Sequence, residues 1–288
     1  MNSAKIRSAA HIDLEFKYLR KAAEDFRYLL NRGYPRKASL ELVGNRYELA
    51  FDERHILHRG VFSDVDSEAR RKKIISIKTL KNKDLAIDGH NVLITIEAGL
   101  SGRPLILADD GFVRDISGLS GSFKKTEMTE KGIELIVTFL KKWRPRHTLF
   151  LFDAPISKSG ILAQELRALL KKESLPGDAM AVKVPEKILI GFPGVIATSD
   201  TAIIDQSEKV IDLAGDLIRE RIGLKSLPRW KRRRVLKGRV SSEKFTPLES
   251  PLLSNGVNSY RPGHLVGIPD RIHDILSLSG ITDEIEVA

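Results

Sequence analysis

Between residues 84 and 223 the chain alternates short apolar runs with longer amphipathic stretches. The runs have the length and composition of strands, and the stretches repeat apolar residues at helical spacing. Strands that alternate with helices form βαβ units, so this region predicts an α/β domain with a mainly parallel sheet flanked by helices. The expected strands are residues 85–97, 104–108, 147–152, 179–184 and 195–198, and the expected helices are 129–143, 157–173 and 205–222.

The first connection in this region is too short for a crossover between parallel strands. We therefore expect residues 85–97 and 104–108 to form an antiparallel hairpin. A turn centred near Leu100 would place Asp109 opposite Asn91, a few residues from Asp88. A shift of the register by one residue would weaken this pairing.

The segments on either side differ from this middle region. Residues 1–80 predict a helical module, with helices around 16–30, 36–50 and 52–58 and then a charged connector. Residues 224–288 are rich in turn-forming residues and predict an irregular extension. The sequence thus predicts three parts, at residues 1–80, 84–223 and 224–288.

The positive charge of the chain is concentrated in these flanking parts. The net charge is +10 overall, +6 for residues 1–80, zero for 81–224 and +4 for 225–288. Basic flanks around a neutral centre suit a polyanionic partner such as nucleic acid, although solubility alone is the simpler interpretation. The six basic residues between positions 70 and 81 can likewise contact phosphates or line a solvated helix face. The expected phosphate-binding residues of the C-terminal extension are Arg229, Lys231, Arg232, Arg233 and Arg234.

Aspartates stand at or near the ends of three of the expected strands. They are Asp88 in "LAIDGHN", Asp153 in "TLFLFDAP" and Asp200 in "VIATSD". Because the carboxyl ends of parallel strands share one edge of a sheet, we expect these acids to converge, with Asp109 joining them from the hairpin. Converging carboxylates repel one another unless a cation lies between them, and Mg²⁺ or Mn²⁺ prefers such oxygen ligands. The chain has no cysteine, so thiolate ligands are excluded.

Each of these acids also has an ordinary structural interpretation. Asp88-Gly89 is typical of a turn, Asp153 can simply end a strand, and Asp200 can cap a helix. Lys158, with the serines on both sides of it, can either hold a phosphate at a helix start or cap that helix. The joint placement of the aspartates at strand ends favours the functional interpretation.

The motifs "IDGHNVL", "LFLFDAP" and "VIATSDTAIID" together resemble the PIN-like nuclease superfamily, especially its NYN branch. The resemblance covers residues 84–222. Asp88 and Asn91 match the opening Asp-Gly-x-Asn motif, Asp200 matches the later Thr/Ser-x-Asp acid, and Asp205 matches a further acid shortly after it. The whole chain also resembles a poorly characterised prokaryotic family that is divided into two adjacent domains of unknown function.

The resemblance implies a Rossmann-like PIN fold, dependence on Mg²⁺ or Mn²⁺, and cleavage of RNA. We expect Asp88, Asp153 and Asp200 to hold the metal, Asp109 or Asp205 to complete its shell, and Asn91 to orient substrate or water. The alternatives are a non-catalytic RNA-binding protein with a degenerate site, and a metal-dependent phosphatase or nucleotide hydrolase. The sequence shows no membrane span or signal peptide, and we expect a cytoplasmic protein.

Overall fold

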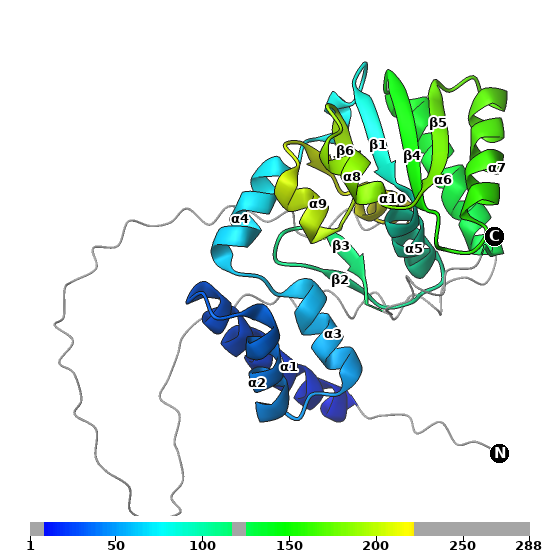
Figure 1. The fold of residues 1–288 in the computed structure, drawn as a ribbon. Coiled ribbons are helices and arrows are strands. Elements are labelled where there is room, and N and C mark those ends of the chain that lie inside the picture. Colours follow the sequence, from blue (N-terminus) through cyan, green and yellow to red (C-terminus); the bar gives the residue numbers. More distant parts are fainter. Residues whose placement is uncertain (1–8, 117–124, 222–288) are drawn as a thin grey trace, which may run out of the picture.

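The computed structural model describes residues 9–116 and 125–221. It has a helical N-terminal module, a small β-hairpin and an α/β part with a five-stranded sheet (Figure 1). The N-terminal helices are α1 (Ala9–Asn31), α2 (Arg36–Arg46), α3 (Phe51–Gly60) and α4 (Asp64–Lys73). The first three were predicted. The fourth lies in the predicted connector. Ser63 caps its start, because the Ser63 hydroxyl accepts a hydrogen bond from the Asp66 N–H.

The five-stranded sheet is parallel throughout, as predicted. Its strands follow the order β5-β4-β1-β6-β7, so the first strand in the sequence is the central one. Their bounds are β1 (Asp84–Asp88), β4 (His147–Asp153), β5 (Gly177–Val182), β6 (Val195–Ala197) and β7 (Val210–Ile211). Parallel strands that run side by side bring all their carboxyl ends to one edge, where a site can form.

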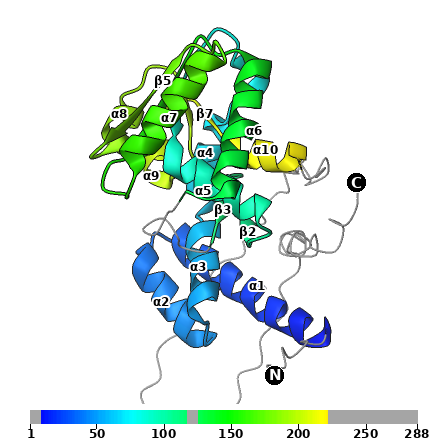
Figure 2. The ribbon, with the colours of Figure 1, turned by 90° about the vertical axis from the view of Figure 1, so that its right-hand side faces the viewer.

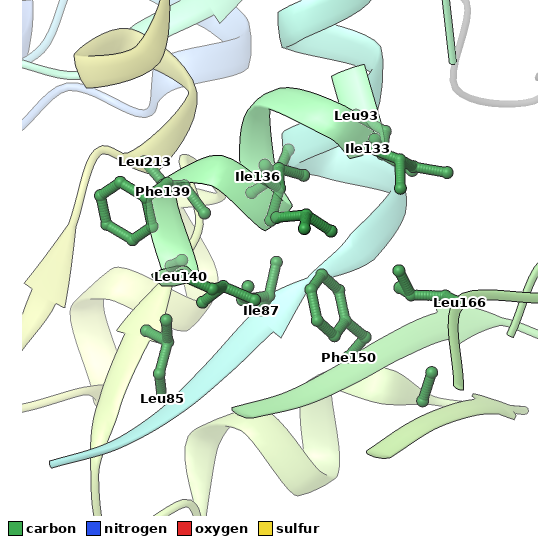
Figure 3. Close-up of a cluster of buried hydrophobic side chains, with 14 of the residues drawn as sticks. Leu85, Ile87, Leu93, Ile133, Ile136, Phe139, Leu140, Phe150, Leu166 and Leu213 are labelled. Carbon is green, nitrogen blue, oxygen red and sulfur yellow. The ribbon is translucent and has the colours of Figure 1, made fainter. Parts of the chain in front are cut away.

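Helices cover both faces of the sheet. One face packs against α5 (Gly89–Leu100), α6 (Glu127–Trp143), α7 (Ser159–Lys172) and α10 (Leu213–Arg221). The other face packs against α8 (Pro185–Ile190) and α9 (Thr201–Gln206). Alternate residues of a strand serve the two cores: Ile87 and Phe150 lie in the larger core shown in Figure 3, whereas Ala86 and Leu151 lie in the smaller one.

The predicted hairpin of residues 85–97 and 104–108 is wrong. Strand β1 ends at Asp88 and helix α5 begins at the next residue. The β-branched residues from Val92 to Ile96 favoured a strand, but α5 is buried on nearly all sides and so has no amphipathic pattern. Residues 105–107 form β2 (Leu105–Leu107), which pairs with β3 (Val113–Asp115) in a separate two-stranded sheet. Asp109 lies in the turn of this second hairpin and does not face Asn91.

The single helix predicted over 205–222 is also wrong. Helix α9 already ends at Gln206, strand β7 follows, and α10 begins only at Leu213. Val210 and Ile211 pair with β6 and are fully buried, so two apolar residues of the expected helical stripe are instead the edge strand of the sheet.

The helical module is joined to the α/β part through the β2–β3 hairpin and α4. Figure 2 shows the hairpin between α1–α3 and the sheet. The module has its own core, which includes Phe26, Val43 and Leu57. Arg27 of α1 binds Asp109 with contacts of 2.7–2.9 Å, and Arg70 of α4 binds Asp205 at 2.6 and 2.8 Å. A search of the described residues for a helix that could span a membrane finds none.

Candidate active site

Three aspartates mark the ends of the three central strands. Asp88 is the last residue of β1, Asp153 is the last residue of β4, and Asp200 follows β6 by three residues and caps α9. Because β1 lies between β4 and β6, Asp88 is the middle member of the three. The expected convergence at the carboxyl edge is therefore present for these strands.

The Asp88 carboxyl is buried beside two other acids. Asp88 is only 8% exposed, and its Oδ2 accepts a hydrogen bond of 2.8 Å from the Thr198 hydroxyl. Burial, together with the charges of Asp200 and Asp153, raises the pKa of Asp88 to about 7, against the opposing effect of the Thr198 hydrogen bond. Near neutral pH this carboxyl is therefore partly protonated.

Thr198 links Asp88 to Asp200. Its hydroxyl donates to Asp88 and accepts a hydrogen bond of 3.0 Å from the Asp200 N–H. The Oδ1 of Asp200 accepts from the N–H groups of Ala202 and Ile203 at 2.8 and 3.1 Å, which is the capping role that the sequence left open. The cap uses only one carboxylate oxygen, so capping and ligand binding are compatible.

Asn91 fixes the loop that carries Asp200. Its side-chain Oδ1 accepts hydrogen bonds of 2.9 Å from both the N–H and the hydroxyl of Ser199. Asn91 lies in the first turn of α5, three residues after Asp88. The Asp-Gly-His-Asn sequence thus supplies one acid of the site and, through Asn91, positions a second.

His90 packs against Asp153. Its Nδ1 lies 2.9 Å from Oδ2 of Asp153 and 3.1 Å from the backbone nitrogen of Asp153. Its Nε2 lies 3.4 Å from the hydroxyl of Ser159, at the start of α7. His90 is 3% exposed, and burial lowers its pKa, so the ring is neutral near pH 7 and holds the Asp153 side chain in place.

Asp109 and Asp205, the two predicted completing acids, are held by arginines. Asp109 makes an ion pair with Arg27, and Asp205 makes one with Arg70. By contrast, no lysine or arginine of the described ranges forms an ion pair with Asp88, Asp153 or Asp200. Asp109 and Asp205 are therefore neutralised by arginines, whereas the three aspartates at the strand ends are not.

The basic residues that start the expected phosphate-binding run have internal partners. Besides the Arg70 pair, Arg71 donates to the carbonyl of Asp109, and Lys73 donates to the carbonyls of Ile204 and Asp205. These contacts hold α9 and the β2–β3 turn. Lys158 is exposed and caps α7 with a φ of 66°. The predicted residues Arg229 and 231–234, like the rest of the basic extension, lie outside the described residues.

Three contacts around the site were not predicted: those of Thr198 with Asp88, of Ser159 with His90, and of Arg114 with Ser199. Arg114 of β3 donates from Nε to the carbonyl of Ser199 at 2.8 Å, and its other nitrogens bind the buried Asp110 at 2.8 Å. A hydroxyl two residues before an expected acid was a usable signal for Thr198. The Ser159 and Arg114 contacts span 69 and 85 residues, so no local pattern could identify them.

The site was also tested for its fit to a metal ion. Within residues 9–116 and 125–221, no three His, Cys, Asp or Glu side chains are placed so that together they could hold one. A three-ligand protein cage is thus not preformed. Mg²⁺, however, is commonly bound by one or two carboxylates with water as the remaining ligands, and the Asp88 and Asp200 pair joined by Thr198 fits that mode.

Comparison with known proteins identifies two regions. Residues 18–73 match a protein family of unknown function (DUF434), and residues 77–216 match a domain of unknown function (DUF5616). The chain is 37% identical over 202 residues to the uncharacterized protein MJ0935 of Methanocaldococcus jannaschii, an alignment that covers 69% of this chain and 96% of that protein. No solved structure matches the chain.

Proposed function

The chain belongs to the same two-part family as MJ0935, and we propose that it is a metal-dependent ribonuclease that hydrolyses phosphodiester bonds in RNA. The observation that carries the proposal is the set of three aspartates at the ends of adjacent parallel strands, none of which has a lysine or arginine ion pair in the described ranges. Ordinary strand ends and helix caps do not require three such charges side by side.

The protonation of Asp88 supports a cationic ligand. A carboxyl whose pKa is raised to about 7 by burial and by two neighbouring acids is disfavoured in its charged form. A divalent cation reverses this, because it stabilises every carboxylate around it. We assign Mg²⁺ or Mn²⁺ to Asp88 and Asp200, with Asp153 as the third carboxylate of the site.

A divalent cation at this edge would polarise a phosphoryl oxygen and lower the pKa of a bound water. The protein's own residues have distinct tasks. Thr198 holds Asp88 and Asp200 together, Asn91 fixes the loop before Asp200, and His90 fixes Asp153. The neutral His90 ring leaves the negative charge of Asp153 intact, as cation binding requires.

The assignment of RNA as the substrate rests on the resemblance to the PIN-like superfamily and on the basic flanks. We propose that the α/β part is a PIN-like domain of the NYN type. The motifs of that resemblance lie at the ends of β1, β4 and β6, which are neighbours in the sheet. We further propose that the protein acts in the cytoplasm on this substrate.

The test compares the full chain with two matched variants. Asp88→Asn removes the central acid, and Asp84→Asn makes the same change at the other end of the same strand, where Asp84 pairs with the exposed Arg146. Each protein is incubated with single- and double-stranded RNA in the presence of Mg²⁺, Mn²⁺ or EDTA. We expect cleavage by the wild type and Asp84→Asn, and its loss with EDTA and in Asp88→Asn.

Two results would contradict the proposal. RNA binding without cleavage, unchanged in Asp88→Asn and independent of metal, would indicate a non-catalytic RNA-binding protein. Hydrolysis of nucleotides or small phosphate esters but not of RNA would indicate a phosphatase or nucleotide hydrolase. A melting experiment with and without Mn²⁺ gives a readout besides activity, because only proteins that retain Asp88 should be stabilised by the ion.

A further inference from the structure

Two arginines and a histidine gather where the helical module meets the β2–β3 hairpin. Arg36 begins α2, and His58 and Arg59 lie in the last turn of α3. We call them the junction cluster. The Arg36 guanidinium donates a hydrogen bond to the backbone carbonyl of His58, which places the start of α2 against the end of α3. Burial lowers the pKa of His58, and the neighbouring charges of Arg36 and Arg59 lower it in the same direction. No ion pair with a carboxylate is formed by any of the three within the described ranges.

Arg59 connects this cluster to the acid site. Arg114 donates to the backbone carbonyl of Arg59 at 3.5 Å and to that of Ser199 at 2.8 Å, so the end of α3 lies beside the loop before Asp200. Burial and the charge of Arg114 lower the pKa of Arg59, while the charges of Asp115 and Asp200 raise it. The Nε of Arg59 is buried and has no hydrogen-bond partner. A buried donor of this kind costs free energy until an acceptor forms a hydrogen bond with it.

Arg36, like Arg59, is a partly buried arginine without a carboxylate partner among the described residues. Its guanidinium lies 4.6 Å from the centre of the Phe62 ring, which Arg70 and Arg114 also approach, at 4.5 and 5.2 Å. Arg70 and Arg114 are paired with Asp110, whereas Arg36 donates only to the carbonyl of His58. Burial, with the charges of Arg70 and Arg114, lowers the pKa of Arg36 to about 10.

We propose that the junction cluster binds backbone phosphates of the nucleic acid and leads it to the acids beside Asp200. A guanidinium offers a fork of N–H donors that matches phosphate oxygens, and an anion offsets the mutual repulsion of partly buried cations. The helical module would then supply part of the substrate site of the α/β part. The choice of RNA as the ligand rests on the proposed function, whereas the phosphate chemistry rests on the cluster itself.

The test measures binding in the absence of catalysis. Full-length wild type, Arg36→Gln, Arg59→Gln and the double variant are titrated with a labelled single-stranded RNA in EDTA at several salt concentrations. Arg46→Gln is the matched control, because Arg46 is an exposed arginine at the opposite end of the same helix as Arg36. Thermal melting of each variant establishes that it is folded, and Arg59→Lys tests whether charge alone suffices.

We expect each single variant to bind RNA several-fold more weakly and the double variant more weakly still. The slope of log affinity against log salt should fall by about 0.7 for each lost phosphate contact. Arg46→Gln should bind like the wild type. The proposal is overturned if folded Arg36→Gln and Arg59→Gln bind like Arg46→Gln, or if the wild type binds no RNA. Absence of cleavage with metal would contradict only the ribonuclease, because these titrations contain none.

Discussion

At the scale of the residue, the aspartates at the two ends of strand β1 have pKa values shifted in opposite directions. Asp84 forms an ion pair with Arg146 at the amino end, and the hydrogen bond from Arg146 lowers its pKa. Asp88 at the carboxyl end is buried, and its pKa is raised to about 7. A single strand of five residues therefore begins with an ion-paired acid and ends with an acid whose charge is disfavoured by burial.

This cost of burial predicts the stability of Asp88→Asn. In the unfolded chain the carboxyl titrates near its ordinary value of 3.8, and in the folded protein at about 7, so the wild type loses stability as the pH rises between these values. In EDTA the variant should be the more stable protein at pH 8, by up to about 4 kcal/mol at 1.4 kcal/mol per pKa unit, with a smaller difference at pH 5.

Urea unfolding at pH 5 and pH 8 measures this difference. Asp84→Asn serves as the control, because its partner Arg146 is exposed and the pKa of Asp84 is shifted in the other direction. If Asp88→Asn were less stable than the wild type at pH 8, burial would not be opposing the charge of Asp88. Addition of Mn²⁺ should reduce the advantage of the variant if the ion binds there.

At the scale of the element, Gly89 explains how a strand can turn directly into a helix after Asp88. A Cβ at this position would lie 2.3 Å from a ring carbon of Phe152 and 2.9 Å from the carbonyl oxygen of Leu151. The start of α5 is therefore pressed against strand β4, which contains both neighbours. The glycine is needed for this close approach, and the hairpin turn that Asp-Gly suggested is absent.

We predict that Gly89→Ala lowers the free energy of unfolding by about 1–3 kcal/mol, because the backbone carbonyl of Leu151 cannot move away without disturbing the sheet. Gly160→Ala is the matched control, since a Cβ at that helical position meets nothing within 4 Å. It should be neutral or slightly stabilising. Equal denaturant midpoints for the two variants would show that β4 accommodates the methyl group.

The elements also show which features a sequence can reveal. Helix α6 was predicted because one of its faces is apolar and the other is solvated, and β4 because it is a short apolar run between turns. Helix α5 was missed because it is buried on nearly all sides. The acids at the ends of β1 and β4 followed from the parallel sheet, but the assignment of Asp109 depended on a hairpin that does not exist.

At the scale of the whole molecule, buried charge joins the helical module to the sheet. Asp110 is fully buried in the turn between β2 and β3, and it binds Arg114 of the hairpin and Arg70 of α4. Arg114 in turn holds the loop before Asp200. Asp110 and Arg114 are only four residues apart, but Arg70 and Ser199 come from distant parts of the sequence. Neither these long-range contacts nor the order of the strands could therefore be predicted from local patterns.

Because Asp110, Arg114 and Arg70 join the helical module to the sheet, we predict that the described parts unfold together. We also predict that Arg114→Met destabilises them strongly. Loss of the Arg114 guanidinium leaves the buried Asp110 with two 3.4 Å contacts, from Arg70 and from the N–H of Phe112, and breaking a buried pair in this way costs about 3–5 kcal/mol. Arg146→Met, which breaks the exposed pair with Asp84, should change stability far less.

Hydrogen exchange followed during denaturation distinguishes the possibilities. Amides of α1 and of β1 should open with the same free energy in the wild type and should shift together in Arg114→Met. Separate transitions for the helical module and the sheet would contradict the coupling. A loss of stability in Arg114→Met no larger than in Arg146→Met would mean that Arg70 and the Phe112 N–H suffice to stabilise Asp110.

The central place of β1 has a consequence for how the protein is made. This strand is the first of the five to be translated, yet its neighbours β4 and β6 come much later, and Thr198 lies 110 residues beyond the Asp88 that it contacts. Asp88 therefore lacks its neighbouring strands and the other two aspartates of the site until most of the domain has left the ribosome. A site assembled in this order is incomplete during most of the protein's synthesis, while the chain is still attached to the ribosome.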